Sequence, residues 1–549
     1  MNLSPSSLTL GPLWLALASA ALLIVAFPPF NQPWCAWIAL VPWLLLLRRA
    51  PGRAAFWWSF LIGVLFFLGS IWWLTYATVA GWVALCTVLA LVHFALFGVL
   101  AHQVSGPWRV DRGRERRWVA PLLVPTIWVS LEYVRSHLFS GFGWNLLAYS
   151  QAPWIAAIQM ADIAGCWGVS FLVVLVNAAL AQALDRTATS RQRVGAVGFA
   201  GACLLAAVGY GAWRLPQGST PLQGQGTVRI ALVQGNIPQE QKWRLGSETF
   251  ILSKYRTLTK EASASNPDLV VWPETAVPGF LGVDERLTRR VGALARAIGR
   301  PLLVGSPMAS LTGAQAVSTN SAALIDASGA IVQRYDKIHL VPFGEFIPFE
   351  RWFPWLRNRL PPMIGDFVAG RHFTIFDVPI TNHQAPSTRH PSPVVAQRPP
   401  PFSVLICFED IFPSLARRFV RDGARMLLVI TNDAWFGPTA AAYQHAQAST
   451  FRAIELRVPV ARAANTGWSG CIDPSGRWIA SVRDGTGREL FVSGHSTCEL
   501  PLGTTRTLSL RWGDWFSVLC VAATVVWWCS HLLATLRRRS GPFVSATPY

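Results

Sequence analysis

The stretch PFSVLICFED, residues 401–410, begins as an apolar strand and ends in reactive side chains. Ser403 to Cys407 form a short apolar run of the length typical of a buried strand. Two acids, Glu409 and Asp410, follow the cysteine almost at once. Packing alone does not require a hydrophobic strand to end in this way. The stretch therefore predicts a β-sheet with a group of reactive side chains at its edge.

Short apolar segments alternate with amphipathic ones on both sides of this strand, from residue 228 to residue 505. Such alternation predicts an α/β domain with a large sheet core. The expected strands are 229–237, 268–274, 301–307, 321–329, 402–409, 426–433, 458–467 and 469–476. The expected helices are 247–265, 284–299, 413–422 and 442–457.

Two further strand ends in this region carry reactive groups. DLVVWPETA (268–276) delivers Glu274, and RYDKIHLVPFGEFIP (334–348) delivers Lys337 and Glu345. A carboxylate base, an ammonium group and the Cys407 thiol are the parts needed for acyl transfer through a covalent intermediate. Taken singly, each has an ordinary interpretation, because a strand-end cysteine is usually inert core and the charged groups suit a surface or an ion pair. The presence of all three groups at strand ends of one domain favours acyl transfer through a covalent intermediate.

Apolar stretches fill most of the first 215 residues, and 52% of the whole chain is hydrophobic. A membrane helix needs about 20 apolar residues. Eight transmembrane helices are predicted, near 9–27, 34–47, 56–75, 79–103, 118–135, 165–184, 194–213 and 514–536. The expected organisation is a membrane domain at 1–215, a catalytic domain at 228–505, an eighth helix at 511–538 and a tail at 539–549.

The arginines are grouped in alternate loops. They cluster between the second and third, fourth and fifth, and sixth and seventh predicted helices, and after the eighth. The positive-inside rule then places both termini in the cytoplasm and residues 216–510 on the far side. Much of the net charge of +19 is therefore a topology signal, which argues against nucleic acid as a partner. The first helix lacks a basic leader and belongs to a series, so we expect no cleaved signal peptide.

Nine cysteines are present, and six of them lie in apolar runs. No Cys or His spacing typical of a metal site occurs, and no motif indicates a cofactor. The spacing leaves a disulfide between Cys471 and Cys498 open.

Three motifs, WPET with Glu274, YDKIHLVPFGE with Lys337 and ICFED with Cys407, resemble the Glu-Lys-Cys triad of the nitrilase superfamily, in the same order. Together with the membrane helices, the chain resembles the apolipoprotein N-acyltransferases. The resemblance extends through VQGNIPQEQKW (233–243), TNDAWFG (431–437) and LEYVRSHLFSGFGWNLLAYSQ (131–151), so it covers nearly the whole chain.

This resemblance implies a four-layer αββα sandwich on the periplasmic side of a bacterial inner membrane, carried by about eight helices. The implied reaction moves a fatty acyl group from a phospholipid such as phosphatidylethanolamine to the N-terminal α-amino group of a diacylglyceryl-cysteine apolipoprotein. Cys407 is then the nucleophile, Glu274 the general base and Lys337 the oxyanion stabiliser. No cofactor or metal is implied, and we expect a monomer.

Five further residues match supporting positions of the family. Glu345 is expected to orient Lys337, and Glu409 supports the nucleophile strand. Phe408 follows the nucleophile where the family commonly has Tyr, which leaves its backbone N–H unchanged. Trp243 and Trp435 match positions on mobile arms at the substrate entrance, although interfacial or core aromatics are the ordinary interpretation.

Three other functions remain open. A membrane-tethered amidase would use the same triad and pass the acyl group to water. A non-enzymatic lipid receptor would not need the triad, and a transporter would need broken helices with charges at mid-membrane. Polar residues inside the predicted helices, among them Glu132 and Arg135, form either an ion pair or a lipid headgroup site.

Overall fold

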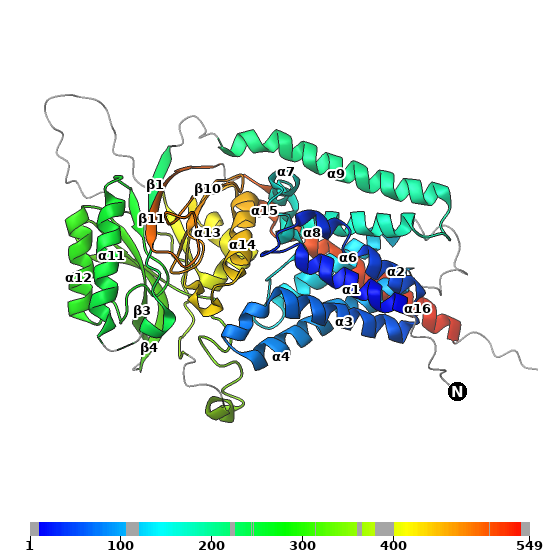
Figure 1. Cartoon of the computed structure of the whole chain (residues 1–549), viewed down its shortest axis with the longest axis horizontal. Coiled ribbons are helices and arrows are strands. Elements are labelled where there is room, and N and C mark those ends of the chain that lie inside the picture. Colours follow the sequence, from blue (N-terminus) through cyan, green and yellow to red (C-terminus); the bar gives the residue numbers. More distant parts are fainter. Residues whose placement is uncertain are drawn as a thin grey trace, which may run out of the picture.

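The computed structural model describes residues 10–105, 120–219, 226–242, 244, 246–312, 315–359, 365–378, 400–503 and 506–539. Figure 1 shows two parts side by side along the long axis. We call residues 10–219 and 506–539 the helical part, and residues 226–503 the sheet part. Both the first and the last described helices belong to the helical part.

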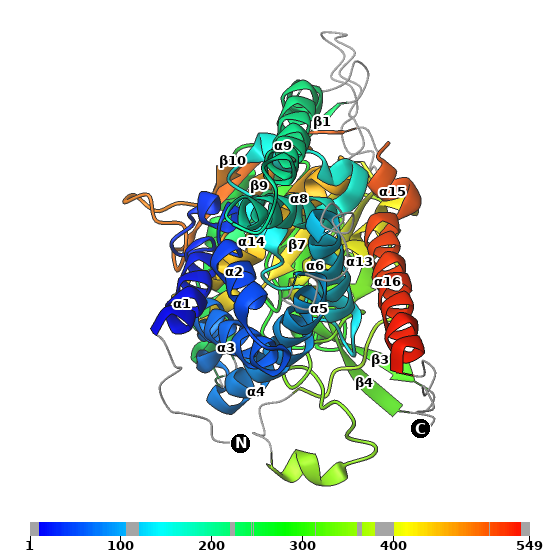
Figure 2. The same cartoon turned by 90° about the vertical axis from the view of Figure 1, so that its right-hand side faces the viewer.

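Apolar helices make up the helical part, because nearly every helical turn there carries large hydrophobic side chains. The helices are α1 (Leu10–Val25), α2 (Val41–Arg49), α3 (Gly52–Ser70), α4 (Val79–Leu89), α5 (Leu96–Ser105), α6 (Ala120–His137), α7 (Ile155–Ile158), α8 (Ala161–Ala183), α9 (Ser190–Ser219), α15 (Leu508–Trp512) and α16 (Trp515–Arg539). A π-helical turn, Ala90–Ala95, joins α4 to α5 in one continuous rod. Helix α8 is the central one, because 78% of its most apolar stretch is buried, against 17% for α16. Figure 2 shows the other helices grouped around it.

Five of the described helices are long and apolar enough to cross a membrane, which is fewer than the eight predicted. They are Gly52–Ser70, Val79–Val104, Ala161–Ala183, Ser190–Pro216 and Trp515–Leu536. The predicted span 34–47 is interrupted, since Pro33–Trp37 forms a 3₁₀ turn and α2 has only nine residues. A nine-residue helix is about 14 Å long, roughly half the apolar thickness of a bilayer. The described parts of α1 and α6 have 16 and 18 residues, and α6 contains Glu132 and Arg135.

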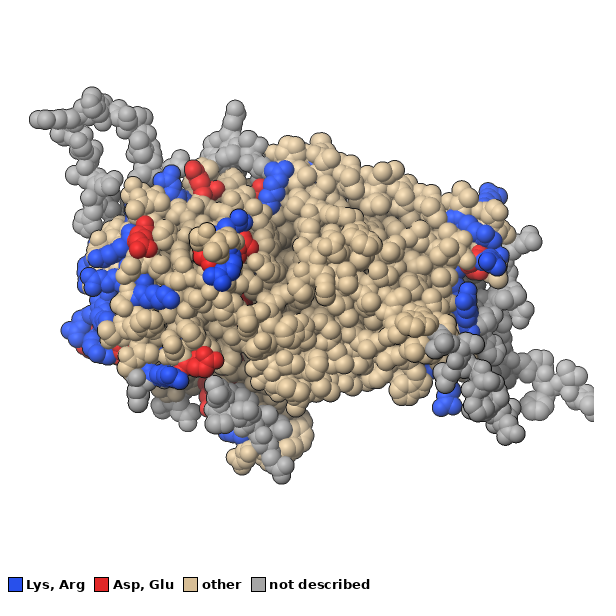
Figure 3. All heavy atoms as spheres, in the orientation of Figure 1, with Lys and Arg blue, Asp and Glu red and all other residues tan. Residues whose placement is uncertain are grey.

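Charged side chains gather at the two ends of the molecule. On the face shown in Figure 3, they cover the sheet part and the far tip of the helical part, with a broad uncharged belt between. At the tip, Arg48 forms an ion pair with Asp185 at 3.1 Å, which joins the end of α2 to the end of α8. A belt of this kind is what a lipid-facing surface requires.

The sheet part contains two mixed sheets. The first has the order β11-β1-β2-β3-β4-β5, and the second has the order β10-β9-β8-β7-β6. The strands are β1 (Thr227–Gln234), β2 (Leu269–Val271), β3 (Leu302–Thr312), β4 (Gln315–Ile325), β5 (Ile331–Asp336), β6 (Phe402–Ile406), β7 (Met426–Thr431), β8 (Val460–Ala464), β9 (Gly470–Ile472), β10 (Trp478–Ser481) and β11 (Gly494–Pro501). Strands β6, β7 and β8 are parallel, so their carboxyl ends lie along one edge.

Helices cover the outer face of each sheet and complete four layers (Figure 1). Helices α11 (Ser247–Ser263) and α12 (Glu285–Ile298) cover the first sheet, while α13 (Pro413–Arg421) and α14 (Ala441–Leu456) cover the second. Alternation along β1 explains the layering: Ala231 and Val233 pack under the helices, whereas Ile230 and Leu232 face the space between the sheets. The predicted α/β domain with four layers is confirmed, and each of its four predicted helices is present.

Three strands, β5, β10 and β11, lie outside the predicted set. Each is at the edge of its sheet, where one side of the strand has no neighbour. Their sequences mix polar and apolar residues and lack the apolar run found in β6, the edge strand whose five residues are all buried.

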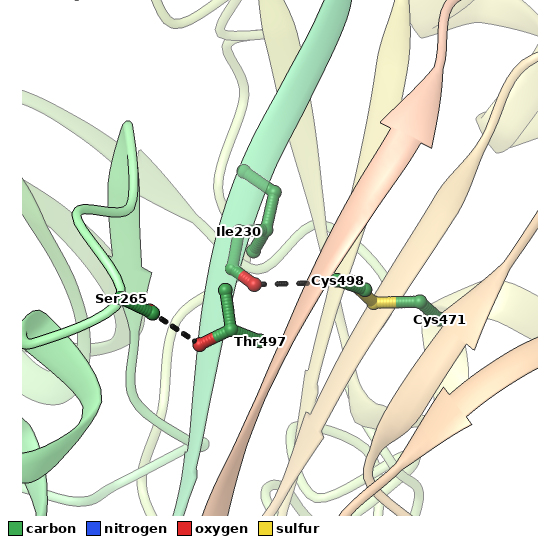
Figure 4. Close-up of a disulfide and its surroundings, with 5 residues drawn as sticks. All are labelled: Ile230, Ser265, Cys471, Thr497 and Cys498. Atoms are coloured by element: carbon green, nitrogen blue, oxygen red, sulfur yellow. Dashed lines mark hydrogen bonds between the residues drawn. A yellow bond between two sulfur atoms is a disulfide. The ribbon is translucent and has the colours of Figure 1, made fainter.

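A disulfide joins Cys471 on β9 to Cys498 on β11, which settles the pairing that the spacing left open. Figure 4 shows that it links the two sheets across the interior, with Cys498 next to the backbone of Ile230 on β1.

Candidate active site

Cys407 lies directly after β6, on the first residue of a 3₁₀ turn that spans Cys407–Ile411. All five residues of β6 are buried, and this fixes the position of the strand end. The backbone of Cys407 is left-handed, with φ of 54°. A left-handed conformation is costly for a residue with a side chain and is found mainly where function or surrounding structure requires it.

Glu274 lies just beyond β2 and is held by both carboxylate oxygens. Its Oε1 accepts a hydrogen bond from Asn320 Nδ2 at 2.7 Å, and its Oε2 accepts one from the backbone N–H of Asn432 at 2.8 Å. Asn320 belongs to the first sheet and Asn432 follows β7 of the second. The carboxylate is therefore fixed between the two sheets, at the edge where Cys407 lies.

Lys337 follows β5 and is almost fully buried, with 1% of its surface exposed. Its Nζ lies 2.9 Å from Glu345 Oε2 and 3.6 Å from Glu274 Oε1. Burial alone would lower the pKa of this lysine, but the two carboxylates outweigh it and raise the pKa above its ordinary value. The side chain is thus a permanent cation.

Burial raises the pKa of the Cys407 thiol, and the negative charge of Glu274 raises it further. Lys337 acts in the opposite direction. The Lys337 ammonium lies 3.6 Å from the Glu274 carboxylate, and the charges of both groups act on the pKa of the Cys407 thiol at the end of β6. A thiol with a raised pKa is protonated at neutral pH, so Cys407 could act as a nucleophile only with a base beside it.

The two supporting glutamates organise the backbone around the triad. Glu345 accepts hydrogen bonds from Lys337, Asn320 and the N–H of Val341. Glu409 accepts four: from Tyr335 Oη and the N–H groups of residues 338, 339 and 406. Glu409 therefore joins the end of the Lys337 strand to the end of the Cys407 strand. Burial raises the pKa of Glu409 to about 7.

The remaining predicted site residues lie nearer the surface. Phe408 is half-buried and packs against Phe412, with ring centroids 5.1 Å apart. Trp435 is 43% exposed on the turn Asp433–Phe436, and its neighbour Phe436 packs on Trp73 of the helical part. This places Trp435 at the junction between the two parts. Trp243 lies outside the described residues.

Sequence reasoning did not single out three polar residues around Glu274. Asn320 and Asn432 supply its hydrogen bonds, and Lys242 Nζ donates to the Glu274 carbonyl oxygen at 3.3 Å and to Thr275 Oγ1 at 2.9 Å. Asn432 is part of the quoted motif TNDAWFG and Lys242 of VQGNIPQEQKW, so both motifs contained the signal. Asn320 lies in the polar run STNS (318–321), and nothing in that run indicated a functional site.

Glu132 and Arg135 were predicted either to pair with each other or to bind a headgroup. In the structure each of them holds the backbone of one connecting segment of the helical part. Glu132 Oε1 accepts from the N–H of Leu147 at 2.8 Å, and Arg135 Nη1 donates to the carbonyl of Trp144 at 2.9 Å. Their shared role is to anchor the segment that faces α14.

Two family models match the chain, one in each part. Residues 19–179 match the apolipoprotein N-acyltransferase N-terminal domain, and residues 229–496 match the carbon-nitrogen hydrolase domain. An apolipoprotein N-acyltransferase of Geobacter metallireducens is 36% identical over 524 residues, which cover 93% of this chain and 94% of the relative.

The chain belongs to the apolipoprotein N-acyltransferase family.

Other members of the family match this chain over a similar length. The enzyme of Methylococcus capsulatus is 34% identical and covers 92% of this chain and 94% of the relative. The enzyme of Bradyrhizobium diazoefficiens is 33% identical, with 85% and 80% covered. Among solved structures, an amidase of the nitrilase superfamily from Nesterenkonia AN1 is 19% identical and covers 52% of this chain and 94% of that chain, with a TM-score of 0.35.

Proposed function

We propose that this enzyme moves a fatty acyl group from a phospholipid to the N-terminal α-amino group of a diacylglyceryl-cysteine apolipoprotein, through a thioester on Cys407. The observation that carries the proposal is the position of the Glu274–Lys337–Cys407 group at the sheet edge, in a sheet part docked on lipid-facing helices. The names of the relatives supply the acceptor, and the apolar belt favours a lipid donor.

In the first half-reaction, Glu274 removes the thiol proton and the Cys407 sulfur attacks the ester carbonyl carbon of the phospholipid. The negative charge moves to the carbonyl oxygen, where the Lys337 ammonium and the backbone N–H of Phe408 stabilise it. The carbon–oxygen bond then breaks, and the departing lysophospholipid oxygen takes the proton from Glu274. The products are an acyl-cysteine and a lysophospholipid.

In the second half-reaction, the α-amino group of the apolipoprotein attacks the thioester carbon. Glu274 takes a proton from the amine, and the same oxyanion donors act again. The carbon–sulfur bond breaks, an amide forms, and the proton passes to the Cys407 sulfur. Because the first product leaves before the acceptor reacts, the scheme is ping-pong, and a single chain carries every residue it uses.

We place the sheet part in the periplasm and both termini in the cytoplasm. Arg48 and Arg49 at the end of α2, Arg53 at the start of α3, and the arginines around the turn from α8 to α9 support this orientation. Both groups lie at helix ends away from the sheet part (Figure 1). The Cys471–Cys498 disulfide supports it independently, because disulfides persist mainly in oxidising compartments.

This orientation requires α1, α2 and α6 to cross the membrane as well. The interrupted segment before α2 is stabilised by Asn177 of α8, whose Oδ1 accepts from the N–H of Leu40 and whose Nδ2 donates to the carbonyl of Ala36. Backbone that leaves the helical conformation inside a membrane needs such internal partners. We therefore propose eight crossings, with α2 as the second half of a broken one.

The deciding experiment is to incubate the purified full-length enzyme with phosphatidylethanolamine alone and examine the Cys407 peptide by mass spectrometry. We expect one added acyl chain that is labile to hydroxylamine and is lost when a diacylated lipopeptide is added. Cys407→Ala and Glu274→Ala should abolish it, whereas Cys529→Ala, which removes an exposed cysteine of α16, should not. An unmodified Cys407 in folded enzyme would reject the phospholipid donor and favour an amidase or a lipid receptor.

A further inference from the structure

His445 lies on α14, on the side of the second sheet that faces away from the first. It is buried, with 1% of its surface exposed. Its Nε2 is hydrogen-bonded to the carbonyl oxygen of Cys407 at 3.2 Å and lies 2.8 Å from Asp410 Oδ1. The histidine thus touches the backbone of the nucleophile from behind.

The other ring nitrogen is held just as closely. Nδ1 lies 2.6 Å from Arg462 Nη2 and 3.2 Å from Asp433 Oδ1. Arg462 also donates to Asp410 Oδ2 at 2.9 Å, so two carboxylates and one guanidinium enclose the ring. Trp144 of the helical part covers it, with ring centroids 5.0 Å apart.

These contacts fix the proton on Nε2. In the neutral ring, Arg462 donates to Nδ1, so the ring proton resides on Nε2. In the charged ring both nitrogens carry protons. Nε2 faces two oxygen acceptors, the Cys407 carbonyl and the Asp410 carboxylate, so it donates in either state.

The Cys407 carbonyl and the N–H of Phe408 belong to the same peptide unit. In a trans peptide these two groups point in opposite directions. Helix α14 packs on the outer side of the second sheet, whereas Glu274 and Lys337 come from the first sheet, on the inner side. When His445 holds the carbonyl outward, the N–H of Phe408 is directed inward, toward the reacting carbonyl.

We propose that His445 is a positioning residue that sets the oxyanion-binding N–H of Phe408 by anchoring the carbonyl of Cys407. The left-handed backbone of Cys407 needs such an external partner, because its own conformational preference opposes it. Asp410, Asp433 and Arg462 hold the ring, and Trp144 places it against the helical part. The inference rests on the proposed function only for the identity of the acyl donor.

The test compares two amides that differ by one methylene. In His445→Gln the amide nitrogen reaches the place of Nε2 and can donate to Cys407, whereas in His445→Asn it reaches only the place of Nδ1. His445→Leu removes both contacts. Each variant of the full-length enzyme is tested with p-nitrophenyl butyrate, which acylates Cys407 through an oxyanion, and with iodoacetamide, which alkylates Cys407 without one.

We expect acylation to fall about 30-fold or more in the Asn and Leu variants, since loss of one oxyanion donor costs about a hundredfold to a thousandfold. Alkylation should stay within about threefold of wild type, and the Gln variant should keep most of the acylation rate. Melting temperatures of all three variants establish that they are folded.

Three results would overturn the proposal: equal loss of acylation and alkylation, equal behaviour of the Gln and Asn variants, or unchanged acylation in the Leu variant. The probe is not a phospholipid, so the comparison is informative even if phosphatidylethanolamine fails to acylate wild-type enzyme. If phosphatidylethanolamine fails to acylate the wild-type enzyme, the proposed donor is rejected. The role of His445 is still decided by the acylation and alkylation rates of its variants.

Discussion

At the scale of single residues, Lys337 is a buried cation that forms ion pairs with two carboxylates. Only four of the 47 basic residues in the chain are lysines, so the lysine at position 337 stands where this chain most often uses arginine. A compact ammonium group fits between Glu274 and Glu345 at 3.6 and 2.9 Å, where a planar guanidinium with its longer reach would displace one of them.

Lys337→Met should therefore damage both folding and reaction. It leaves two buried carboxylates without their cation, which costs about 3 kcal/mol or more in stability. Thioester formation should fall about a thousandfold, measured by rapid-quench mass spectrometry of the Cys407 peptide. Lys337→Arg keeps the charge, so we expect a melting temperature nearer to wild type with acylation still reduced about a hundredfold. An active Arg variant would show that charge, not shape, is what the site requires.

Lys242 makes the free energy of unfolding depend on pH. Burial lowers the pKa of this lysine to about 7, below its ordinary value of about 10.4. Between these values the unfolded chain binds the proton and the folded chain does not, so the free energy of unfolding rises with pH across this window. Below pH 7 the folded protein holds a buried charge.

Lys242→Met should consequently stabilise the enzyme relative to wild type by a few degrees at pH 6. The difference in melting temperature should shrink as the pH rises from 7 to 10. Lys260→Met, at an exposed position on α11, provides the control and should show no such trend. A difference that is constant with pH would mean that the folded and unfolded chains bind the Lys242 proton equally, so that burial does not lower the pKa of this lysine.

At the scale of elements, α14 joins the two parts. Nearly all of its residues are buried, because the second sheet covers one side and the helical part covers the other. Gln444 makes four bonds there: Oε1 accepts from the indoles of Trp73 and Trp144, and Nε2 donates to the carbonyls of Pro28 and Ser70.

Gln444→Glu keeps the two acceptor contacts and turns the donor into an oxygen that faces two carbonyls. We expect it to lower the free energy of unfolding by about 1 to 3 kcal/mol, the usual cost of unsatisfied buried polar groups. Thermal unfolding in detergent measures this. Gln333→Glu, a partly buried position on the edge strand β5, is the matched substitution and should cost less. Equal melting temperatures of the two variants would contradict the role assigned to Gln444.

The disulfide is the other connection between elements. It closes a loop with a sequence separation of 27 and ties an edge strand of one sheet to the other sheet. Replacing Cys471 and Cys498 together with serine should cost about 2 to 4 kcal/mol and lower the melting temperature by several degrees. Acylation of Cys407 at 25 °C should be unchanged, since neither cysteine touches the site. Cys529→Ser serves as control, and a double variant as stable as wild type would refute the prediction.

At the scale of the whole molecule, the sheet part depends on the helical part for its structure. Arg457 and Arg417 cross the boundary to bind Asp162 and Asp514 at 2.7 and 2.8 Å, and α14 lies beneath helices along its length. Removing the helical part would leave these groups unpaired and expose an apolar face.

We therefore expect residues 226–503 produced alone to aggregate or to bind a hydrophobic dye, unlike the full chain in detergent. Size-exclusion chromatography and dye fluorescence measure the two outcomes. A soluble, monomeric fragment that Cys407-directed reagents modify normally would show that the sheet part folds independently and that docking serves only to place it at the membrane.

The sequence by itself indicated the family, the nitrilase-like domain, its four helices, eight of the eleven strands in the described residues, and the three residues of the proposed triad. Apolar runs and motifs are local: Cys407 and Glu274 each follow an apolar run, and Lys337 lies in the motif YDKIHLVPFGE. Strands β5, β10 and β11 were missed because, unlike the fully buried edge strand β6, they are partly exposed and carry polar residues. Five described helices meet the length and hydropathy of a membrane span, and the predicted segment 34–47 is broken before α2, where Asn177 of a distant helix satisfies the backbone.

Only the tertiary structure decided which polar groups surround the site. Asn320 and Asn432 fix Glu274 from opposite sheets, and His445 reaches Cys407 from a helix 38 positions further along the chain. These contacts join segments far apart in sequence, and a single Asn or His in a strand or helix looks the same whether it faces solvent, core or a reacting group. Their roles follow from packing of the layers, which no local pattern encodes.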